Sequence, residues 1–382
     1  MTNLSATMHP LIITPLFPPA VGGAATYFRE LTTHLAQRPE IERLTILTER
    51  APGAAVHQRS GKMHVMRLLP QRVSAARHSR LWHSVSYVAT QLWFWQRLRP
   101  LVAQQQVDLL HFHTRFRGKL FFASLRKSGV PVVADLRDQM SPVAELISCT
   151  DWLLCCSQGV QQFALAQGFP PQKLTLIPNA YTLQPPPSAA AVAAVCAKFG
   201  LAAAPFVLYI GEITPNKGVY ELLHAFDQWR QTHADVQLVL AGANRQGDTF
   251  LTEVASRTGV VYLNTIAHAE VLSLMRQAQI VILPSRSEGM PTVILEAISM
   301  GAKVICPPNI PEFDQHLPDF VLPAVTPTAI CTMLEQVWRN PARPSYPLAD
   351  HHIDRVVNAV LSGYAQILQR PRPIFMHESP TG

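Results

Sequence analysis

One segment, Leu283 to Gly301 (LPSRSEGMPTVILEAISMG), predicts the end of a buried strand, a short polar loop and a helix. Pro291 stands where the helix would begin, because the first helical residue needs no N–H donor. Gly301 stands where the helix would end, since glycine readily adopts the left-handed backbone of a helix stop. Strands that lead through a tight loop into a helix build parallel sheets, so the segment predicts an α/β fold.

The same segment predicts a site for an anion that also carries hydroxyl groups. Backbone N–H groups around Met290 to Val293 open the helix and point outward, and the helix dipole adds positive potential there. Two carboxylates, Glu288 in the loop and Glu296 in the helix, lie beside them. An ionised carboxylate only accepts hydrogen bonds, which sugar hydroxyls donate. A diphosphate joined to a sugar describes a nucleotide sugar.

Apolar strands alternate with amphipathic helices in two series, which predicts two parallel sheets. The first series of expected strands covers residues 10–15, 43–48, 107–111, 130–134, 151–156 and 174–177. The second covers residues 206–210, 236–241, 260–263, 280–283 and 303–306. A proline-rich stretch, 184–188, separates the two series. We therefore expect two doubly wound Rossmann-like domains that face each other across a cleft, with ligands bound beyond the carboxyl ends of the strands.

Composition indicates a well-cored globular protein of 382 residues, with 48% hydrophobic and 15% charged residues. The N-terminus lacks the basic region of a secretory signal, and no apolar run approaches the ~20 residues that span a membrane. The six cysteines include no C-x-x-C pair, which favours reduced thiols and disfavours zinc. We expect a cytoplasmic protein.

Positive charge is concentrated in the N-terminal half. Between Arg50 and Ala134 there are fourteen Lys and Arg but one acid, Asp108, whereas the rest of the chain is net acidic. Such a local excess predicts an anionic partner. No nucleic-acid-binding motif accompanies it, so we expect no nucleic acid partner. A membrane surface or a phosphate-bearing acceptor fits better, and a plain solvated face remains the alternative.

A helix is predicted at about 79–104, within this basic block. Apolar residues spaced three or four apart form one stripe along it: Leu81, Val85, Val88, Leu92 and Trp95. The neighbouring Trp93 and Phe94 make the stripe wider, and arginines flank its ends: Arg77, Arg80, Arg97 and Arg99. Packing of the stripe against the sheet is the favoured interpretation. Aromatic residues beside arginines also suit the interface of a membrane, so peripheral attachment to its inner face is the alternative.

The 283–301 segment resembles the E-x7-E signature of the family-4 retaining glycosyltransferases, which have the GT-B fold. Glu288 and Glu296 match its two glutamates. The resemblance implies that Glu288 holds the sugar, Glu296 the ribose, and that Glu288 and Lys217 serve catalysis. The implied donor-binding residues are Gly22, Gly23, Gly211, Arg286, Gly289, Met290, Pro291, Thr292, Val293 and Glu296.

Residues 206–226 (FVLYIGEITPNKGVYELLHAF) resemble the strand, Gly-Arg, loop and Lys-Gly pattern of the family. Lys217 matches the lysine that contacts the donor diphosphate, where a cation offsets charge on the leaving group. Glu212 stands at the family's arginine position, and a carboxylate repels phosphate. Lys217 therefore acts alone, or Arg286 or Arg245 replaces the missing arginine.

The N-terminal half contains further matches, with departures. DLLHFH and VVADLRD provide the acceptor-side candidates His113, Arg137 and Asp138, but Arg137 replaces the family's usual histidine. LTLIPNAY carries Ala180 in place of a glycine. PPNIPEF places Glu312 at a glutamate position near the donor. No Asp-x-Asp motif for a diphosphate-bound metal is present, so we expect no metal and no cofactor.

The expected division is an acceptor-side domain at 1–183, a linker at 184–203, a nucleotide-sugar-binding domain at 204–345, a helix returning to the first domain at 346–370, and a disordered tail at 371–382. We expect a retaining, metal-independent hexosyltransferase that moves a sugar from a nucleotide sugar to a glycan or lipid-linked acceptor in surface polysaccharide or glycolipid synthesis. The alternative is a weak or inactive GT-B scaffold that acts as a partner subunit.

Overall fold

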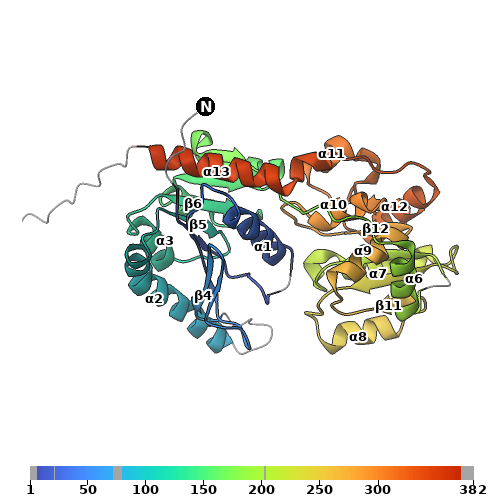
Figure 1. Ribbon diagram of the computed structural model, residues 1–382. Helices are drawn as coiled ribbons and strands as arrows, with labels where there is room; N and C mark the ends of the chain where they lie inside the picture. Colours follow the sequence, from blue (N-terminus) through green and yellow to red (C-terminus); the bar gives the residue numbers. More distant parts are fainter. Residues whose placement is uncertain (1–6, 21, 72–79, 202–203, 371–382) are drawn as a thin grey trace, which may run out of the picture.

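The computed structural model describes residues 7–20, 22–71, 80–201 and 204–370, and the side chains of Arg80 and His83 are outside this description. It confirms the expected α/β fold with two parallel-sheet domains (Figure 1). The predictions for Arg77 and for the 371–382 tail lie outside the described residues.

The N-terminal domain is built on an eight-stranded sheet in the order β3-β4-β2-β1-β5-β6-β7-β8. All neighbours are parallel except the β3–β4 hairpin. The sequence did not predict this hairpin, because β3 is fully exposed and polar and β4 includes histidine and arginine. The strands are β1 (Pro10–Ile13), β2 (Leu44–Glu49), β3 (His57–Ser60), β4 (Met63–Leu69), β5 (Leu109–His113), β6 (Val132–Leu136), β7 (Trp152–Cys155) and β8 (Leu174–Leu176).

Five helices of this domain connect the strands. They are α1 (Gly23–Ala36), α2 (Arg80–Gln105), α3 (Lys119–Arg126), α4 (Val143–Ile147) and α5 (Gln158–Ala166). The favoured interpretation of the α2 stripe is wrong, because Leu81, Val85, Val88, Leu92 and Trp95 are all exposed. The buried face of α2 is instead formed by Phe94, Leu98, Leu101 and Val102.

The C-terminal domain has a five-stranded parallel sheet in the order β11-β10-β9-β12-β13. Its strands are β9 (Phe206–Ile210), β10 (Gln237–Ala241), β11 (Val260–Tyr262), β12 (Ile280–Ile282) and β13 (Lys303–Ile305). The order reverses between β9 and β12, so the loops that follow these two strands adjoin at the switch point where ligands bind. The helices are α7 (Val219–Trp229), α8 (Asp248–Ala255), α9 (His268–Gln277), α10 (Thr292–Ser299), α11 (Pro311–His316) and α12 (Pro327–Arg339).

Two segments connect the domains. The 184–203 stretch contains α6 (Ala189–Lys198), which packs against α9 of the C-terminal domain. The chain returns through α13 (Ile353–Gln369), which lies along the N-terminal domain beside α1 (Figure 1). The Tyr364 hydroxyl of α13 is hydrogen-bonded to His111 Nδ1 at 2.5 Å.

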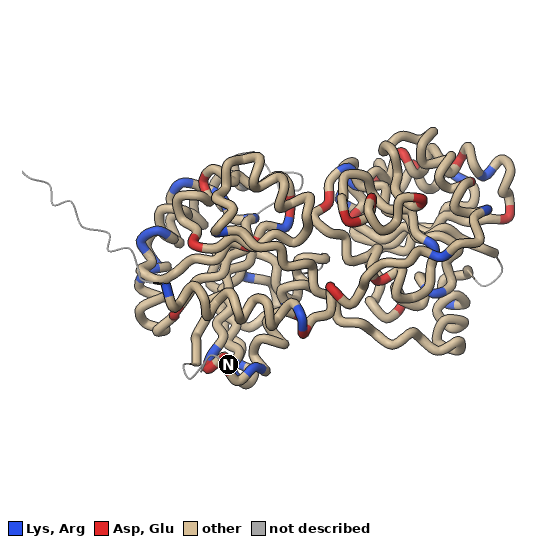
Figure 2. Tube along the Cα trace, turned by 90° about the horizontal axis from the view of Figure 1, so that it is seen from above, with Lys and Arg blue, Asp and Glu red and all other residues tan. Residues whose placement is uncertain are grey.

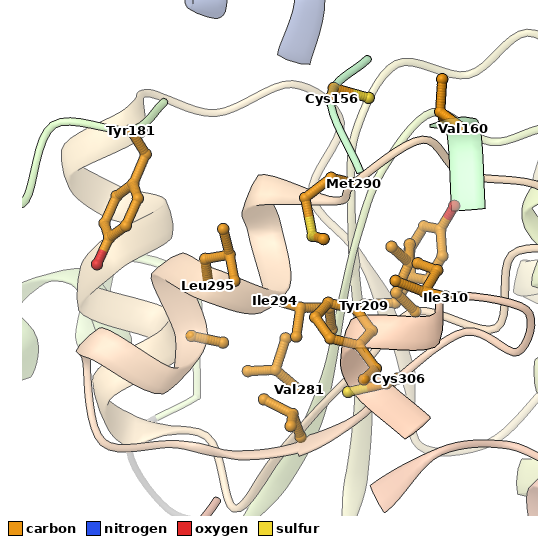
Figure 3. Packing of buried hydrophobic residues seen from close by; sticks show 14 of the residues in the cluster. Cys156, Val160, Tyr181, Tyr209, Val281, Met290, Ile294, Leu295, Cys306 and Ile310 are labelled. Atoms are coloured by element: carbon orange, nitrogen blue, oxygen red, sulfur yellow. The ribbon is translucent and has the colours of Figure 1, made fainter. Parts of the chain in front are cut away.

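The hydrophobic core is continuous across the domain boundary. Figure 3 shows Cys156 and Val160 of the N-terminal domain above Met290 and Ile310 of the C-terminal domain, and all four belong to one buried cluster. The loop before α10 is therefore packed directly on the N-terminal domain.

Candidate functional site

The site lies where the loops after β9 and β12 meet. The first loop ends in a 3₁₀ turn, Pro215–Lys217, and Gly218 then opens α7 with a φ of 68°. A Cβ on Gly218 would come within 2.0 Å of the Pro284 carbonyl oxygen, so only glycine permits this close packing of the two loops. The packing brings Lys217 Nζ into a close ion pair with Glu288 Oε1. The two residues expected to serve catalysis are thus adjacent.

The loop continues into α10. Pro291 is the N-cap and Thr292 the first helical residue, one position later than the sequence indicated, and Gly301 adopts the expected left-handed stop with a φ of 80°. Thr292 and Val293 therefore form the first turn, where helix amides and the dipole favour anions. A Cβ on Gly289 would come within 2.1 Å of the Arg137 carbonyl oxygen, so the loop touches the other domain there.

Glu296 lies in α10 with 16% of its side chain exposed, and its Oε1 is 3.4 Å from His268 Nε2 of α9. The hydrogen bond with Glu296 raises the pKa of His268. His268 was not predicted from the sequence. A protonated His268 donates a hydrogen bond to the Glu296 carboxylate.

The side chain of Arg286 is engaged by Glu221 and by the turn that carries Lys217. Its Nη2 is 2.7 Å from Glu221 Oε1, and its Nη1 donates to the Pro215 carbonyl oxygen at 2.9 Å. The hydrogen bond with Glu221 raises the pKa of Arg286. The structure therefore gives Arg286 a role in fixing the Pro215–Lys217 turn.

Glu212 and Arg245 form a second ion pair near the first. Arg245 Nη2 and Nε lie 2.6 and 3.1 Å from Glu212 Oε1, because the backbone after β10 pairs with the backbone after β9. Burial raises the pKa of Tyr209, and the charges of Glu288 and Glu212 raise it further. The Tyr209 hydroxyl donates to the Glu212 backbone carbonyl at 2.8 Å, and Gly211 packs on the same hydroxyl. Glu212 and Lys217 both belong to the loop between β9 and α7, so the two ion pairs share this loop.

On the N-terminal side, Gly22 is the N-cap of α1 and Gly23 its first residue. Both glycines are exposed, and among the described residues no atom from outside their own stretch of chain lies within 4 Å of a Cβ built on either of them. His113 ends β5 and is buried, with its ring 5.0 Å from that of Phe28.

Arg137 and Asp138 have partners within the protein. The Arg137 guanidinium stacks over the Tyr27 ring at 3.2 Å, pairs with Asp135 and donates to Asn179 Oδ1. Asp138 Oδ1 accepts hydrogen bonds from Met140 N at 2.9 Å and from Ser141 Oγ at 3.0 Å. The side chain of Arg137 is buried beneath the site, and Asp138 shapes the adjoining loop.

Asn179 connects these parts and was not predicted as a site residue. Its Nδ2 donates to the Met290 carbonyl oxygen at 2.5 Å, and its own carbonyl oxygen lies 2.8 Å from His351 Nδ1. With Arg137 on its Oδ1, the side chain of Asn179 links the loop after β6 to the loop before α10, and its backbone carbonyl contacts the returning segment. The Ile-Pro-Asn run was the sequence signal from which this role of Asn179 could have been predicted, because an asparagine side chain offers both hydrogen-bond donors and an acceptor.

Two absences complete the description. Among the described residues, no three His, Cys, Asp or Glu side chains are grouped so that they could hold a metal ion. In the same part of the chain, no helix is both long enough and apolar enough to cross a membrane.

Comparison with known families matches both halves of the chain. Residues 21–184 match the model described as Glycosyltransferase Family 4, and residues 204–340 match Glycosyl transferases group 1. The chain is 32% identical to the O-antigen chain mannosyltransferase B of Escherichia coli over 126 residues, which are 32% of this chain and 33% of that protein. The alignments with curated relatives cover between 23% and 33% of those proteins.

Solved structures resemble the whole chain. Sucrose-phosphate synthase from Thermosynechococcus elongatus superposes with a TM-score of 0.76 at 18% identity, covering 94% of this chain and 98% of that one. Anabaena HepE in complex with UDP-glucose gives a TM-score of 0.67 at 16% identity, covering 95% and 97%. At these identities the likeness establishes the architecture of the two domains.

Proposed function

The chain belongs to the family-4, group 1 glycosyltransferases with the GT-B fold, and we propose that it transfers a hexosyl group from a nucleotide sugar with retention of configuration. The observation that carries the proposal is the Lys217–Glu288 pair at the start of α10. It places a cation and a hydrogen-bond acceptor beside helix amides, as a sugar diphosphate requires.

Each group has a distinct task in this proposal. Lys217 and the first-turn amides of α10 bind the diphosphate and stabilise the charge that develops on the leaving group. Glu288 accepts hydrogen bonds from the transferred sugar, and Glu296 accepts them from the ribose. The acceptor enters from the Gly22–Gly23 side. No divalent ion is required, because the lysine and the helix dipole supply the positive potential.

The acceptor is a glycan or a lipid-linked sugar of surface polysaccharide or glycolipid synthesis. The similarity to an O-antigen mannosyltransferase supports this assignment. The UDP-glucose found in HepE supports a nucleoside diphosphate sugar as the donor class. All six cysteines are free thiols, which supports a reducing, cytoplasmic compartment.

A partner subunit with little turnover is the second candidate. Three departures from the family pattern favour this candidate. Glu212 places a carboxylate where the family has a phosphate-binding arginine, Ala180 replaces a glycine, and Arg137 replaces a histidine. The two candidates differ in turnover, because a scaffold could still bind a nucleotide.

The test is a thermal-shift screen against nucleotide sugars, followed by turnover with the one that stabilises most. A true donor at ~100 times its Kd adds about 2.7 kcal/mol of stability. Glu296→Ala should weaken donor binding, whereas Glu288→Ala should mainly lower kcat, because contacts with the moving sugar change in the transition state. Activity should survive EDTA. Equal effects of the two substitutions on nucleoside diphosphate affinity would contradict the assignment, and binding without turnover would favour the scaffold.

A further inference from the structure

The outward face of α2 carries an unusual concentration of exposed apolar side chains. In the described part of the chain, seven of the twelve exposed large hydrophobic residues belong to this helix: Leu81, Trp82, Val85, Tyr87, Val88, Leu92 and Trp95. Leu81 and Trp82 are 71% and 61% exposed. We propose that the side of the helix that carries Leu81, Val85, Val88, Leu92 and Trp95, the α2 face, docks on the surface of an anionic lipid bilayer.

The geometry of α2 makes one continuous surface. Leu81, Val85, Val88, Leu92 and Trp95 recur every three or four residues, so they lie along one side of the helix for about 21 Å. The opposite side is fixed to the protein. Gln91 Nε2 donates to the Arg117 carbonyl oxygen at 2.5 Å, and Gln91 Oε1 accepts from Phe121 N at 3.1 Å. The apolar side therefore cannot turn inward without losing these contacts.

Basic residues line the face on the side of α3. Lys127 Nζ lies 4.2 Å from the centroid of the Trp95 ring. Arg117 and Lys119 are exposed beside the point where Gln91 joins α2 to α3. Arg99 is exposed near the end of the stripe. Figure 2 shows Lys and Arg positions along the outer side of this domain.

A hollow borders the other side of the face, between α2 and β4. It has a volume of about 430 Å³, and its lining includes Arg50, Arg97, Leu92 and Trp93. A lining with two arginines beside apolar and aromatic side chains matches a phosphate head group that continues into a hydrocarbon chain. Glu49 precedes Arg50 in the chain, and the acid that follows α2, Asp108, is held by His9, whose backbone N donates to Oδ2 at 2.7 Å.

Charge decides between a bilayer and a second copy of this chain as the occupant. A symmetric dimer through the α2 face would bring the basic rims of both copies together, which is repulsive. An anionic bilayer attracts the same rims and receives the apolar stripe at the level of its head groups. Surface docking of this kind needs no membrane-spanning helix.

The first experiment is flotation of the full chain with vesicles of phosphatidylcholine alone or mixed equally with phosphatidylglycerol. We expect binding to the mixed vesicles only, weakened by added salt. The triple substitution Leu81→Gln, Val85→Gln and Val88→Gln should lower the vesicle affinity at least about tenfold. The matched control replaces three exposed leucines elsewhere, Leu165, Leu183 and Leu251, with glutamine and should bind as the wild type does.

The second experiment separates charge from hydrophobicity. Replacing Arg97, Arg99 and Lys127 with glutamine should lower the affinity at least about tenfold, since each basic residue at an anionic surface contributes about 1 kcal/mol. The control with the same net charge replaces Lys198, Arg339 and Arg355 with glutamine; these are exposed residues on other surfaces. Donor affinity should be unchanged in every variant, so a failure of docking is distinguishable from a failure of the proposed activity.

A third measurement does not depend on variants with altered charge. Brominated lipid in the mixed vesicles should quench tryptophan fluorescence, and Trp82→Phe with Trp95→Phe should remove most of this quenching. The proposal is overturned if the wild type ignores lipid charge or does not bind at low salt. It is also overturned if the control triples lose as much affinity as the α2 triples, or if light scattering shows a dimer that the α2 triples dissociate.

Discussion

Exchange of the charges of Glu212 and Arg245 tests how this chain compensates for a missing arginine. Arg286 and Arg245 are each paired with a glutamate, Glu221 and Glu212, and only Arg245 is paired with the carboxylate at the family's arginine position. In the proposed function Arg245 replaces that arginine, and the incoming diphosphate would draw its guanidinium from Glu212. We therefore expect Arg245→Ala to weaken donor binding.

The expected effects of Arg245→Ala on stability and on donor affinity follow from how exposed the ion pair is. The side chains of Arg245 and Glu212 are 40% and 46% exposed, so the pair contributes only about 0.2–1 kcal/mol to stability. A charge-assisted hydrogen bond to the diphosphate is worth about 1.5–3 kcal/mol, or about 10- to 150-fold in affinity. Arg245→Ala should thus change donor affinity far more than it changes the unfolding midpoint.

The assay is calorimetric titration of the nucleotide sugar selected by thermal shift. The Glu212→Ala/Arg245→Ala double variant should bind better than Arg245→Ala alone, because the single variant leaves an uncompensated carboxylate near the phosphates. The exchange Glu212→Arg with Arg245→Glu restores the family's arrangement and should retain near wild-type affinity. The expectation is contradicted if Arg245→Ala leaves donor affinity unchanged, or if the effects of the two single substitutions on affinity simply add in the double variant. The pair would then be an ordinary surface ion pair.

Three further predictions concern charged groups. Lys217→Ala should lower turnover at least ~100-fold, measured in steady-state kinetics, through loss of one oriented charge stabiliser. Affinity for a nucleotide sugar should rise as the pH rises through the raised pKa of His268, because neutral His268 releases Glu296; His268→Gln should flatten this profile in pH-dependent titrations. Glu312→Gln should raise the thermal midpoint at neutral pH. Burial raises the pKa of Glu312, so its ionisation costs stability as the pH rises, and the difference should vanish in acid, where the carboxyl is protonated in both states.

Much of the fold was predictable because the strands that build it are apolar throughout. Strand β9 is predicted with the same bounds, and β10 and β12 differ by one residue. The β3–β4 hairpin was missed, since it pairs through its backbone at an exposed edge and its side chains carry little apolar signal. For α2, the spacing of the stripe was read correctly, but a sequence does not say which of two apolar faces meets the core.

The motifs of Glu288, Glu296 and Lys217 single out these residues in the sequence; the structure brings Lys217 and Glu288 into contact, and the roles of all three stay predictions. Side-chain partners were not predictable where they come from distant segments. Nothing local indicates that Arg245 meets Glu212, because their contact depends on the β9–β10 register. Arg137 belongs to a motif and was read as a group facing the acceptor, but its role follows from Tyr27 and Asn179, which lie far away in the chain.

The contacts of Asn179 suggest why the departures from the family pattern can coexist with a formed site. The donor-side loop is fixed from the N-terminal domain, through Met290 on Asn179 and through Gly289 against the Arg137 backbone. Arg137 is buried, and Asp135 and Asn179 satisfy its charge and hydrogen-bonding groups. Where the family has a histidine that faces the acceptor, this chain therefore has Arg137, a buried side chain that supports the loop before α10. Met290 on Asn179 and Gly289 on the Arg137 backbone together hold this loop, so the positions of Glu288 and the α10 amides depend on both domains at once.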